Sequence, residues 1–312
     1  MYKDTAIHVV VPAYNEEVHV GAVLASVPDY VDRVVVVDDC STDGTGPVVQ
    51  ACTDRRVVLL RTPRNVGVGG AMVVGYRWAL DHGADIVVKM DGDGQMPAEA
   101  LPALLDALVE QGADYAKGNR FLQRELVATR MPAERIVGNV VLTFLTKLAS
   151  GYWNVFDPQN GYTAVRASAL RVLPLDRLHP GYFFENDMLV CLNVHDYRVV
   201  DVPMPPVYNE ERSHLSILAV LFTFPLLLVR RFFHRVVEKY VLRDFSPIAL
   251  FLFLGLASLT FGIVLGGSLW LHSYWSGIPT PTGSIILTLL ALVVGFQLCL
   301  QAIVLDIQAT PR

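Results

Sequence analysis

The sequence predicts an α/β domain with an open, mostly parallel sheet, followed by two membrane-spanning helices. Apolar, β-branched runs alternate with helical stretches from Ile7 to about Tyr115, which is the pattern of βαβ units. Polar residues follow each run, and ligands of such sheets bind beyond the carboxyl ends of the strands. Near the end of the chain, the stretches 247–271 and 284–305 carry no charged residue and are long enough to span a bilayer.

The predicted strands are nearly continuous in apolar residues, as expected for parallel strands covered on both faces. In the first part of the chain they are Ile7–Val11, Val34–Val37, Val57–Leu60 and Ile86–Met90. The helices predicted around them are Glu16–Val27, Thr45–Cys52, Val68–His82 and Ala98–Gln111. Further along we expect strands at Tyr115–Arg120, Thr163–Arg166 and Val199–Val202, with helices at Ala133–Ser150 and from Phe183 onward.

Composition excludes several classes of function. The chain has 312 residues, enough for one large domain or two ordinary ones, and its net charge of −5 gives no reason to expect nucleic acid. The four cysteines have no metal-binding spacing, so we expect free thiols in a reducing compartment. The N-terminus has no signal-peptide pattern. A nicotinamide enzyme is disfavoured because the run 67–70 matches the dinucleotide fingerprint poorly.

Two carboxylates two residues apart follow the fourth predicted strand. In an extended chain Asp91 and Asp93 point to the same face, and Gly92 and Gly94 let the backbone turn there. Converging carboxylates repel each other unless a cation lies between them, and a hard divalent ion with oxygen ligands is the natural candidate. Gln95 adds a neutral oxygen. The alternative is a polar turn without a ligand.

The other strand ends offer groups suited to a nucleotide. Asp38 and Asp39 can accept hydrogen bonds from a base or ribose, and Tyr14 offers a flat face for stacking. Arg64, Asn65 and the glycine-rich helix start after them are placed to approach phosphates.

Four blocks, in order, resemble the inverting family 2 glycosyltransferases with the GT-A fold: Val-Pro-Ala-Tyr-Asn-Glu, Val-Asp-Asp-Cys-Ser-Thr-Asp-Gly-Thr, Arg-Asn-Val-Gly-Val-Gly-Gly-Ala and Asp-Gly-Asp-Gly-Gln. The resemblance covers roughly residues 6 to 215. It implies a DxD motif at Asp91-Gly92-Asp93. It also implies two sets of site residues. The nucleotide would be bound by Pro12, Tyr14, Glu16, Asp38 and Asp39. Mg²⁺ or Mn²⁺ on its diphosphate would be held by Asp91, Asp93 and Gln95.

The middle of the chain is similar to polyprenyl-phosphate hexosyltransferases of the dolichol-phosphate mannose synthase type. Arginines hold the acceptor phosphate in that group, and Arg120, Arg135 and Arg212 stand at matching places. The planar guanidinium suits phosphate because it forms paired charged hydrogen bonds. The sequence departs from the pattern at His214, where Lys is usual, and at Asn139, where Ser is frequent.

The acceptor determines whether a general base is needed. A lipid phosphate is already ionised at pH 7, so catalysis would rest on positioning and on the metal. A sugar hydroxyl must lose a proton to a carboxylate, and Asp157, Glu185 and Asp187 are the candidates. For Glu185 and Asp187 the alternative is a structural role, as acidic residues in the first turn of a helix.

The last third of the chain predicts membrane attachment. Leu215–Val229 is apolar but short for a span, and a basic cluster follows it. We expect interfacial helices on an anionic leaflet, with buried packing helices as the alternative. The cluster consists of Arg230, Arg231, Arg235, Lys239 and Arg243 against Glu238 alone.

The positive-inside rule then places the N-terminal domain and both termini in the cytoplasm. Gly262 and Gly266 form a GxxxG pair that could seat one helix on another, and Gln297 and Gln301 are expected to face another helix. We therefore expect three parts: a GT-A domain over 1–213, juxtamembrane helices over 214–245 and a transmembrane hairpin over 246–312.

Taken together, the sequence predicts a membrane-anchored hexosyltransferase that uses a nucleotide-diphosphate sugar and a polyprenyl (undecaprenyl or dolichyl) phosphate. One alternative is a family 2 enzyme that glycosylates a hydroxyl of a glycolipid or polysaccharide. An alternative of another class is a non-catalytic membrane scaffold with the same fold. A nucleotidyltransferase is less favoured, because the glycine-rich signature loop expected early in the chain is missing. A homo-oligomer is compatible with the sequence.

Overall fold

The computed structural model describes residues 1–121, 133–205 and 217–311, with side chains described outside 133–139 and 217–222. Contacts divide the chain into two compact units, Met1–Phe232 with the last residues of the chain, and Phe233–Thr310. The three-part division at residues 213 and 245 stays a prediction.

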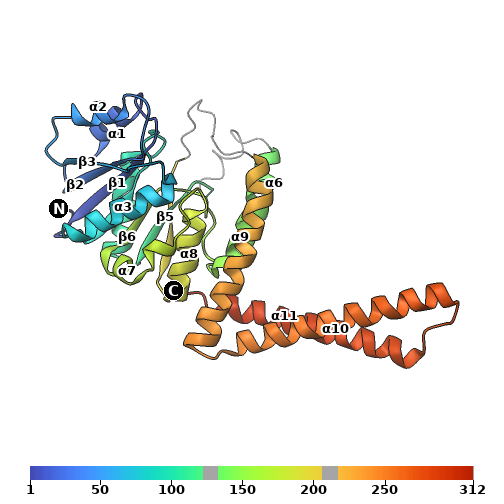
Figure 1. Cartoon of the computed structure of the whole chain (residues 1–312). Coiled ribbons are helices and arrows are strands. Elements are labelled where there is room, and N and C mark those ends of the chain that lie inside the picture. The colour runs from blue at the N-terminus through green and yellow to red at the C-terminus, as the bar shows by residue number, and fades with distance from the viewer. Residues whose placement is uncertain (122–132, 206–216, 312) are drawn as a thin grey trace. The chain divides into compact units, whose positions relative to one another are not determined.

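The first unit is built on a seven-stranded sheet with the order β3-β2-β1-β4-β6-β5-β7 (Figure 1). β6 runs antiparallel to both of its neighbours, β4 and β5, and the other neighbouring pairs are parallel. The predicted mostly parallel sheet is confirmed. The strands are β1 (Ile7–Ala13), β2 (Arg33–Asp38), β3 (Val57–Arg61), β4 (Ile86–Lys89), β5 (Tyr115–Asn119), β6 (Thr163–Arg166) and β7 (Val199–Pro203).

The helices follow the predicted order, with one clear difference at the start. The first helix begins at Val20 rather than at Glu16, because the chain after β1 forms a loop in which Asn15 has a left-handed φ of 59°. The helices are α1 (Val20–Ser26), α2 (Thr45–Gln50), α3 (Gly67–Asp81), η1 (Ala98–Ala100), α4 (Leu101–Val109), α6 (Ala133–Ser150), α7 (Ala167–Val172), η2 (Leu175–Arg177), α8 (Phe184–Val194), α9 (Ile217–Val237), η3 (Glu238–Arg243, a π-helix), α10 (Pro247–Ser276) and α11 (Thr282–Gln308).

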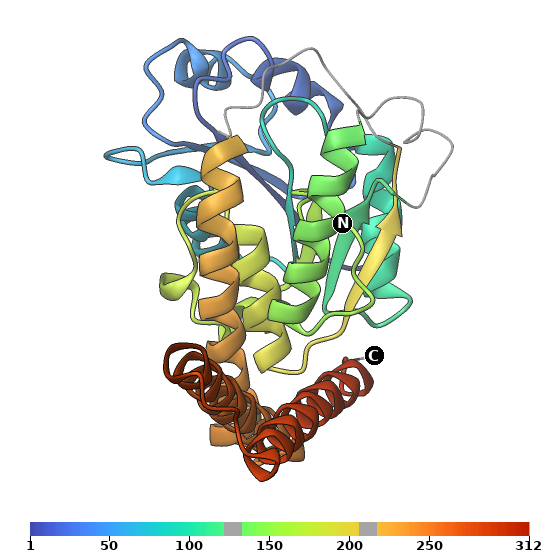
Figure 2. The same ribbon diagram turned by 90° about the vertical axis from the view of Figure 1, so that its right-hand side faces the viewer.

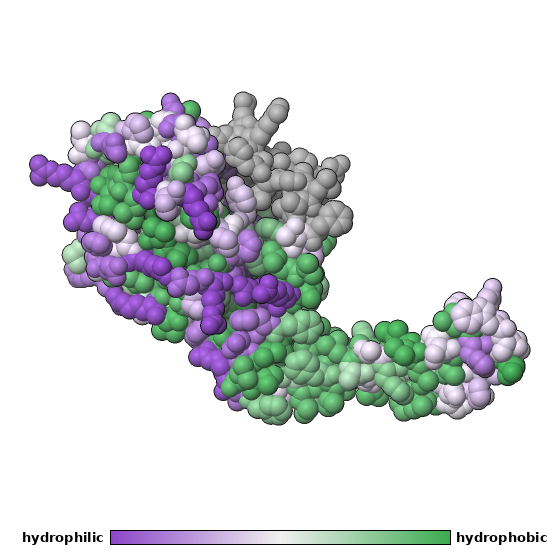
Figure 3. Space-filling model, viewed as in Figure 1, coloured by the Kyte–Doolittle hydropathy of each residue, from purple (hydrophilic) through white to green (hydrophobic). Residues whose placement is uncertain are grey.

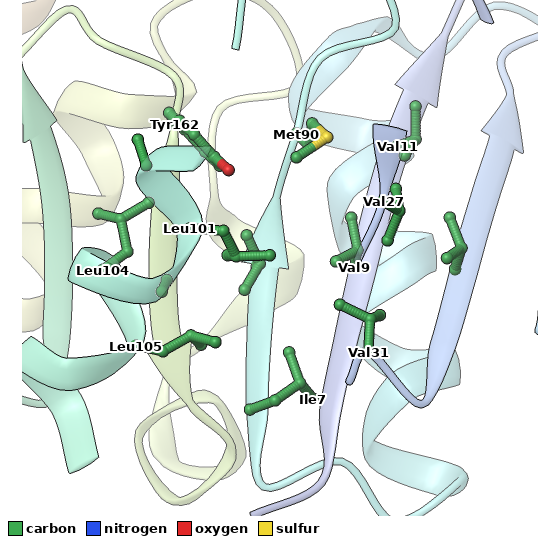
Figure 4. Close-up of a cluster of buried hydrophobic side chains, with 14 of the residues drawn as sticks. Ile7, Val9, Val11, Val27, Val31, Met90, Leu101, Leu104, Leu105 and Tyr162 are labelled. Carbon is green, nitrogen blue, oxygen red and sulfur yellow. The ribbon is translucent and has the colours of Figure 1, made fainter. Parts of the chain in front are cut away.

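Alternating residues of the strands fill two cores, one on each face of the sheet. On one face Val9 of β1 and Val88 of β4 pack against Leu101 and Leu105 of α4 (Figure 4). On the other face Val10 and Val87 pack with residues of α3, α7 and α8. Both faces are therefore covered, as the apolar strands predicted.

The sheet places several loops at one edge. β1, β2, β3, β4 and β5 point the same way, so their carboxyl ends lie along this edge, and antiparallel β6 starts there. Figure 2 shows α6, α8 and the first part of α9 running side by side in this unit. They share a small apolar cluster that includes Ala149, Phe183, Phe224 and Leu228. α8 thus has its first turn supported from two sides.

The second unit contains the predicted pair of long apolar helices, α10 and α11, each long and apolar enough to cross a membrane. The surface along their length is largely hydrophobic (Figure 3). The helices pack through glycines, since a Cβ at Gly262 would lie 2.8 Å from Leu292 and one at Gly266 would lie 2.7 Å from Thr288. The proposed use of the GxxxG pair is confirmed. Gln297 and Gln301 are exposed in the single chain, so the expectation that they face another helix stays a prediction.

The basic cluster is not wholly directed outward. Arg235 is fully buried and forms a bidentate ion pair with Asp306 of α11, at 2.7 and 3.0 Å. The Tyr240 hydroxyl donates to the same carboxylate at 2.7 Å. Arg231 bonds to Asp187 within the first unit. The interpretation of these two arginines as membrane-facing charges is therefore wrong, because buried acids far away in the sequence take up their charge.

Candidate active site

The loops after β1 and β2 are bonded to each other at the sheet edge. The backbone N–H of Asn15 donates to Ser41 Oγ at 3.0 Å, and Asn15 Oδ1 accepts from the Thr42 N–H at 2.9 Å. The buried Asp38 carboxylate accepts from the Ser41 N–H at 2.8 Å and lies 3.4 Å from Arg61 Nε. These bonds fix the loops that carry the nucleotide candidates.

The remaining nucleotide candidates of these loops lie around the same edge. Pro12 is buried near the end of β1, and Tyr14 follows with 47% of its side chain exposed. The backbone N–H of Glu16 donates to Thr45 Oγ1 at 2.8 Å. Gly92 lies beneath the Glu16 side chain, since a Cβ at residue 92 would be 3.2 Å from Glu16 Cγ. Glu16 therefore adjoins the turn that carries Asp91 and Asp93.

Asp39 holds the loop that leads into α3. Its carboxylate accepts hydrogen bonds from Thr62 Oγ1 and the Val66 N–H, both at 2.8 Å, and from the Gly67 N–H at 2.7 Å. Arg64 and Asn65 are exposed in this loop. Asp39 therefore fixes the positions of these two residues.

The glycine-rich start of α3 packs against protein rather than presenting a phosphate cradle. A Cβ at Gly69 would lie 2.2 Å from the His179 carbonyl oxygen, and one at Gly67 would lie 2.6 Å from the Pro180 oxygen. The Gly70 N–H donates to the Pro180 oxygen at 3.0 Å. Arg64 and Asn65 remain the phosphate candidates of this segment.

Asp91 and Asp93 lie in the turn after β4, as the sequence predicted. Gly94 has φ +73°, and the Gln95 N–H donates to Asp93 Oδ1 at 2.9 Å. Gly161, just before β6, leaves room beside them: a Cβ there would lie 2.8 Å from Asp91 Oδ2. A side chain at residue 161 would therefore crowd the Asp91 carboxylate.

Lys89, the last residue of β4, lies in this candidate site and was not predicted from the sequence. It is 2% exposed, and its Nζ lies 2.7 Å from Asp91 Oδ1 and 2.9 Å from Glu185 Oε1 of α8. Burial lowers the pKa of Lys89, but the two carboxylates outweigh burial and raise it above the ordinary value. Lys89 thus carries a positive charge between the two acids.

The donor atoms present fit a divalent metal that is completed by substrate. Asp91 and Asp93 supply hard oxygen ligands, which Mg²⁺ and Mn²⁺ prefer, and Mg²⁺ commonly binds one or two carboxylates together with substrate phosphates. No group of three or more His, Cys, Asp or Glu side chains within 1–121, 133–205 and 217–311 could hold a metal by itself. Further ligands would then come from water or from phosphate oxygens of a substrate.

Of the residues predicted to bind the acceptor or to act as its base, Arg120 and Asp157 bind each other. Arg120 Nε and Nη2 donate to the two oxygens of buried Asp157 at 2.8 and 3.1 Å. This pair fixes the orientation of the guanidinium directly after β5. Of the other acceptor candidates, Arg135 lies in α6, where only its backbone is described, and Arg212 lies outside the described residues.

The first turn of α8 carries Glu185, Asn186 and Asp187, all of them buried. Asp187 Oδ2 accepts from the His179 N–H at 2.8 Å and from Arg231 Nη2 at 2.5 Å. Burial raises the pKa of Asp187 above its usual value, although Arg231 opposes this. Asn186 Oδ1 accepts from Thr146 and Gln159, both at 3.0 Å. α8 is therefore tied to α6, to the loop before β6 and to α9.

A second buried lysine lies in register with the first. Lys89 and Lys117 both pair with Thr163 of β6, and Lys117 pairs in turn with Asp201 of β7. Lys117 Nζ donates to the Asn160 carbonyl. Burial lowers the pKa of Lys117 to about 8 and raises that of Asp201 to about 6. Lys89, Thr163, Lys117 and Asp201 thus form a polar row across β4, β6, β5 and β7. Its Lys117 contacts the loop that carries Asp157 and Asn160.

Comparison with known proteins identifies the domain. Residues 8–173 match the model of glycosyl transferase family 2. The undecaprenyl-phosphate mannosyltransferase of Micrococcus luteus is 34% identical over 206 residues, covering 64% of this chain and 83% of the relative. The polyprenol monophosphomannose synthase of Mycolicibacterium smegmatis is 33% identical over 203 residues, covering 63% and 75%.

A third relative and a solved structure extend the comparison. The UDP-N-acetylglucosamine–dolichyl-phosphate N-acetylglucosaminyltransferase of Methanococcus voltae is 29% identical and covers 66% of this chain and 88% of the relative. Glucosyl-3-phosphoglycerate synthase of Mycobacterium tuberculosis, solved with Mn²⁺ and UDP, has the same fold, with a TM-score of 0.54 and 22% identity. That alignment covers 74% of this chain and 80% of the synthase. The predicted GT-A fold is confirmed.

Proposed function

We propose, from the premise that this chain belongs to glycosyl transferase family 2, that it transfers a hexose with inversion from a nucleotide-diphosphate sugar to a polyprenyl phosphate. Relatives that carry polyprenyl-phosphate transferase names support this acceptor class. The two long apolar helices support attachment to a membrane, where such an acceptor resides.

The observation that carries the proposal is the pairing of all three candidate bases. Asp157 is bound by Arg120, Glu185 by Lys89 and Asp187 by Arg231. A carboxylate that accepts a proton from a sugar hydroxyl would have to give up such an ion pair, and Asp187 is in addition completely buried. A phosphate acceptor is already ionised and needs no base. The arrangement therefore favours a lipid phosphate over a hydroxyl acceptor.

The proposed donor site lies at the ends of β1, β2 and β4. Tyr14 offers its exposed ring to the base, and Asp38 lies beside the loop that would bind the ribose. Asp91 and Asp93, with Gln95, would hold Mg²⁺ or Mn²⁺ on the diphosphate. The bound ion would supply positive charge that stabilises the leaving diphosphate.

The proposed acceptor site lies beside it, at the end of β5 and the start of β6. The Arg120 guanidinium, oriented by Asp157, would bind the lipid phosphate, together with Arg135 and Arg212. Binding both substrates at fixed positions would provide the in-line approach of phosphate oxygen to the anomeric carbon. We place this domain on the cytoplasmic face, as the basic residues before α10 predict.

The test uses the purified full chain in lipid with Mg²⁺ or Mn²⁺. Labelled UDP- and GDP-sugars are offered with and without undecaprenyl or dolichyl phosphate, and extracted lipid is assayed for acid-labile label. Labelled lipid from one donor, abolished by EDTA, is the expected result. Release of nucleotide without labelled prenyl lipid would refute the phosphate acceptor and point to a hydroxyl. Absence of metal-dependent nucleotide binding would support the non-catalytic alternative.

A further inference from the structure

We propose that Lys89 makes metal binding at Asp91 and Asp93 depend on the donor diphosphate. This inference deepens the proposed function and rests on its metal site. Lys89 would be a positioning residue, since it acts on the metal and donor through Asp91.

The Lys89 ammonium group contacts the first acid of the predicted DxD motif. Lys89 Nζ lies 2.7 Å from Asp91 Oδ1, so one oxygen of that carboxylate is already committed to a cation. Only Oδ2 can then serve a metal ion, so Asp91 binds as a monodentate ligand. The site has two acidic ligands where a metal held by protein alone usually has more.

The positive charge of Lys89 weakens metal binding further. A divalent ion on Asp91 Oδ2 would share its carboxylate with an ammonium ion that is shielded from water, and like charges at short range in a buried site repel strongly. A nucleotide diphosphate brings several negative oxygens, which offset the repulsion and fill the coordination shell. The metal and the donor should therefore bind together, and the metal should bind weakly without the donor.

Glu185 keeps the ammonium in place. It lies 2.9 Å from the same Nζ, and it comes from the first turn of α8, which the Asn186 and Asp187 bonds hold fixed. A Lys89 side chain that left the site would leave buried Glu185 without this cation, which is costly. The ammonium is thus a built-in counter-charge that stays when the metal arrives.

The experiment measures Mn²⁺ binding by the loss of the free-ion signal in electron paramagnetic resonance, with the full chain in lipid and no acceptor. For the native chain we expect weak binding that becomes at least about tenfold tighter when UDP or GDP is added. Lys89→Met should bind Mn²⁺ at least about tenfold more tightly than the native chain without nucleotide. Lys89→Arg, which keeps the charge, should retain the dependence on nucleotide.

Controls separate this role from a structural one. Lys117→Met removes a second buried lysine, whose Nζ donates to the Asn160 carbonyl, and should leave nucleotide-free Mn²⁺ binding unchanged. Lys89→Gln is the second neutral variant if the methionine protein does not fold, as judged by thermal unfolding. Nucleotide-free binding that is unchanged or weaker in these neutral variants would overturn the inference.

The result is independent of the acceptor. A failure to label prenyl lipid would refute the proposed acceptor and leave the Mn²⁺ measurements standing. Mn²⁺ binding that survives Asp93→Asn would show that the metal lies elsewhere, and would overturn the metal site and the role of Lys89 together.

Discussion

Replacing Asp187 by asparagine tests whether this carboxylate is a base or a structural anion. The Asp187 carboxylate is fully buried, and its Oδ2 binds the His179 N–H and Arg231. An asparagine oxygen can accept the same two bonds without the charge. Its amide nitrogen would take the place of Oδ1, which is buried and has no hydrogen-bond partner among the described residues.

The expected cost follows from these contacts. A hydrogen bond to a charged group contributes about 1.5–3 kcal/mol, and a buried amide without a partner costs about 1–3 kcal/mol. Relief of the burial that raises the Asp187 pKa offsets part of both costs. We expect Asp187→Asn to destabilise the chain by about 1–2 kcal/mol and to retain turnover within about tenfold. Loss of a general base would instead reduce turnover by about 10²–10⁴.

Arg231→Met is the matched variant on the other side of the pair. It leaves a buried carboxylate without its cation, which costs about 3–5 kcal/mol. The double variant should recover much of this loss, because the uncompensated charge is gone. Turnover, and thermal unfolding of the full chain in lipid or detergent, provide the two readouts.

The pH dependence gives an independent check. Because the folded-state pKa of Asp187 is raised, the folded chain binds this proton more tightly than the unfolded chain does. The contribution of Asp187 to stability is then greatest below its unfolded-state pKa of about 3.9, and it falls as the pH rises through its folded-state pKa. Arg231→Met should lose more stability at pH 8 than at pH 5. A deficit independent of pH, or loss of turnover in Asp187→Asn in a folded protein, would refute the structural assignment.

Three further predictions use other parts of the structure. Asp93→Asn should abolish metal-stimulated turnover while the unfolding temperature stays near that of the native chain; full activity in a Mn²⁺ titration would place the metal elsewhere. Gly69→Ala should destabilise the folded chain by about 1–3 kcal/mol, because the new Cβ would meet the His179 carbonyl oxygen. Gly267→Ala should not, because there is open space around residue 267. Thermal unfolding of the two variants compares these effects. Burial raises the pKa of Asp201 to about 6, so the contribution of this group to stability falls as the pH rises from about 4 through 6. Asp201→Asn should flatten this slope when unfolding is measured across that range.

The sequence was sufficient to predict a mostly parallel sheet, because valine-rich runs separated by helices leave few alternatives. It did not show that β6 runs antiparallel to its two neighbours. It also located Asp91 and Asp93, since both the motif and its strand lie within one short segment. The start of α1 was predicted too early, because the left-handed turn at Asn15 depends on a bond to Ser41 in another loop. Local pattern cannot show a contact of that kind.

The charged residues show the same limit more strongly. A lysine at a strand end is usually solvated, yet Lys89 is held by Glu185, which lies far along the chain. One local signal was available: Lys89 and Asp91 are two residues apart, so they point to the same face of an extended chain. Arg231 and Arg235 belong to the basic cluster in the sequence, but in the structure they pair with Asp187 and Asp306.

These pairs bear on how two anions can meet in one site. The proposed donor carries a diphosphate and the proposed acceptor a phosphate, so unpaired carboxylates beside them would repel both. Asp157, Glu185 and Asp187 each have a cation supplied by the fold. Three acids near the acceptor position are thereby neutralised before any substrate arrives. In the proposed site Asp91 and Asp93 would instead hold a divalent ion, and its positive charge would lie where the diphosphate leaves.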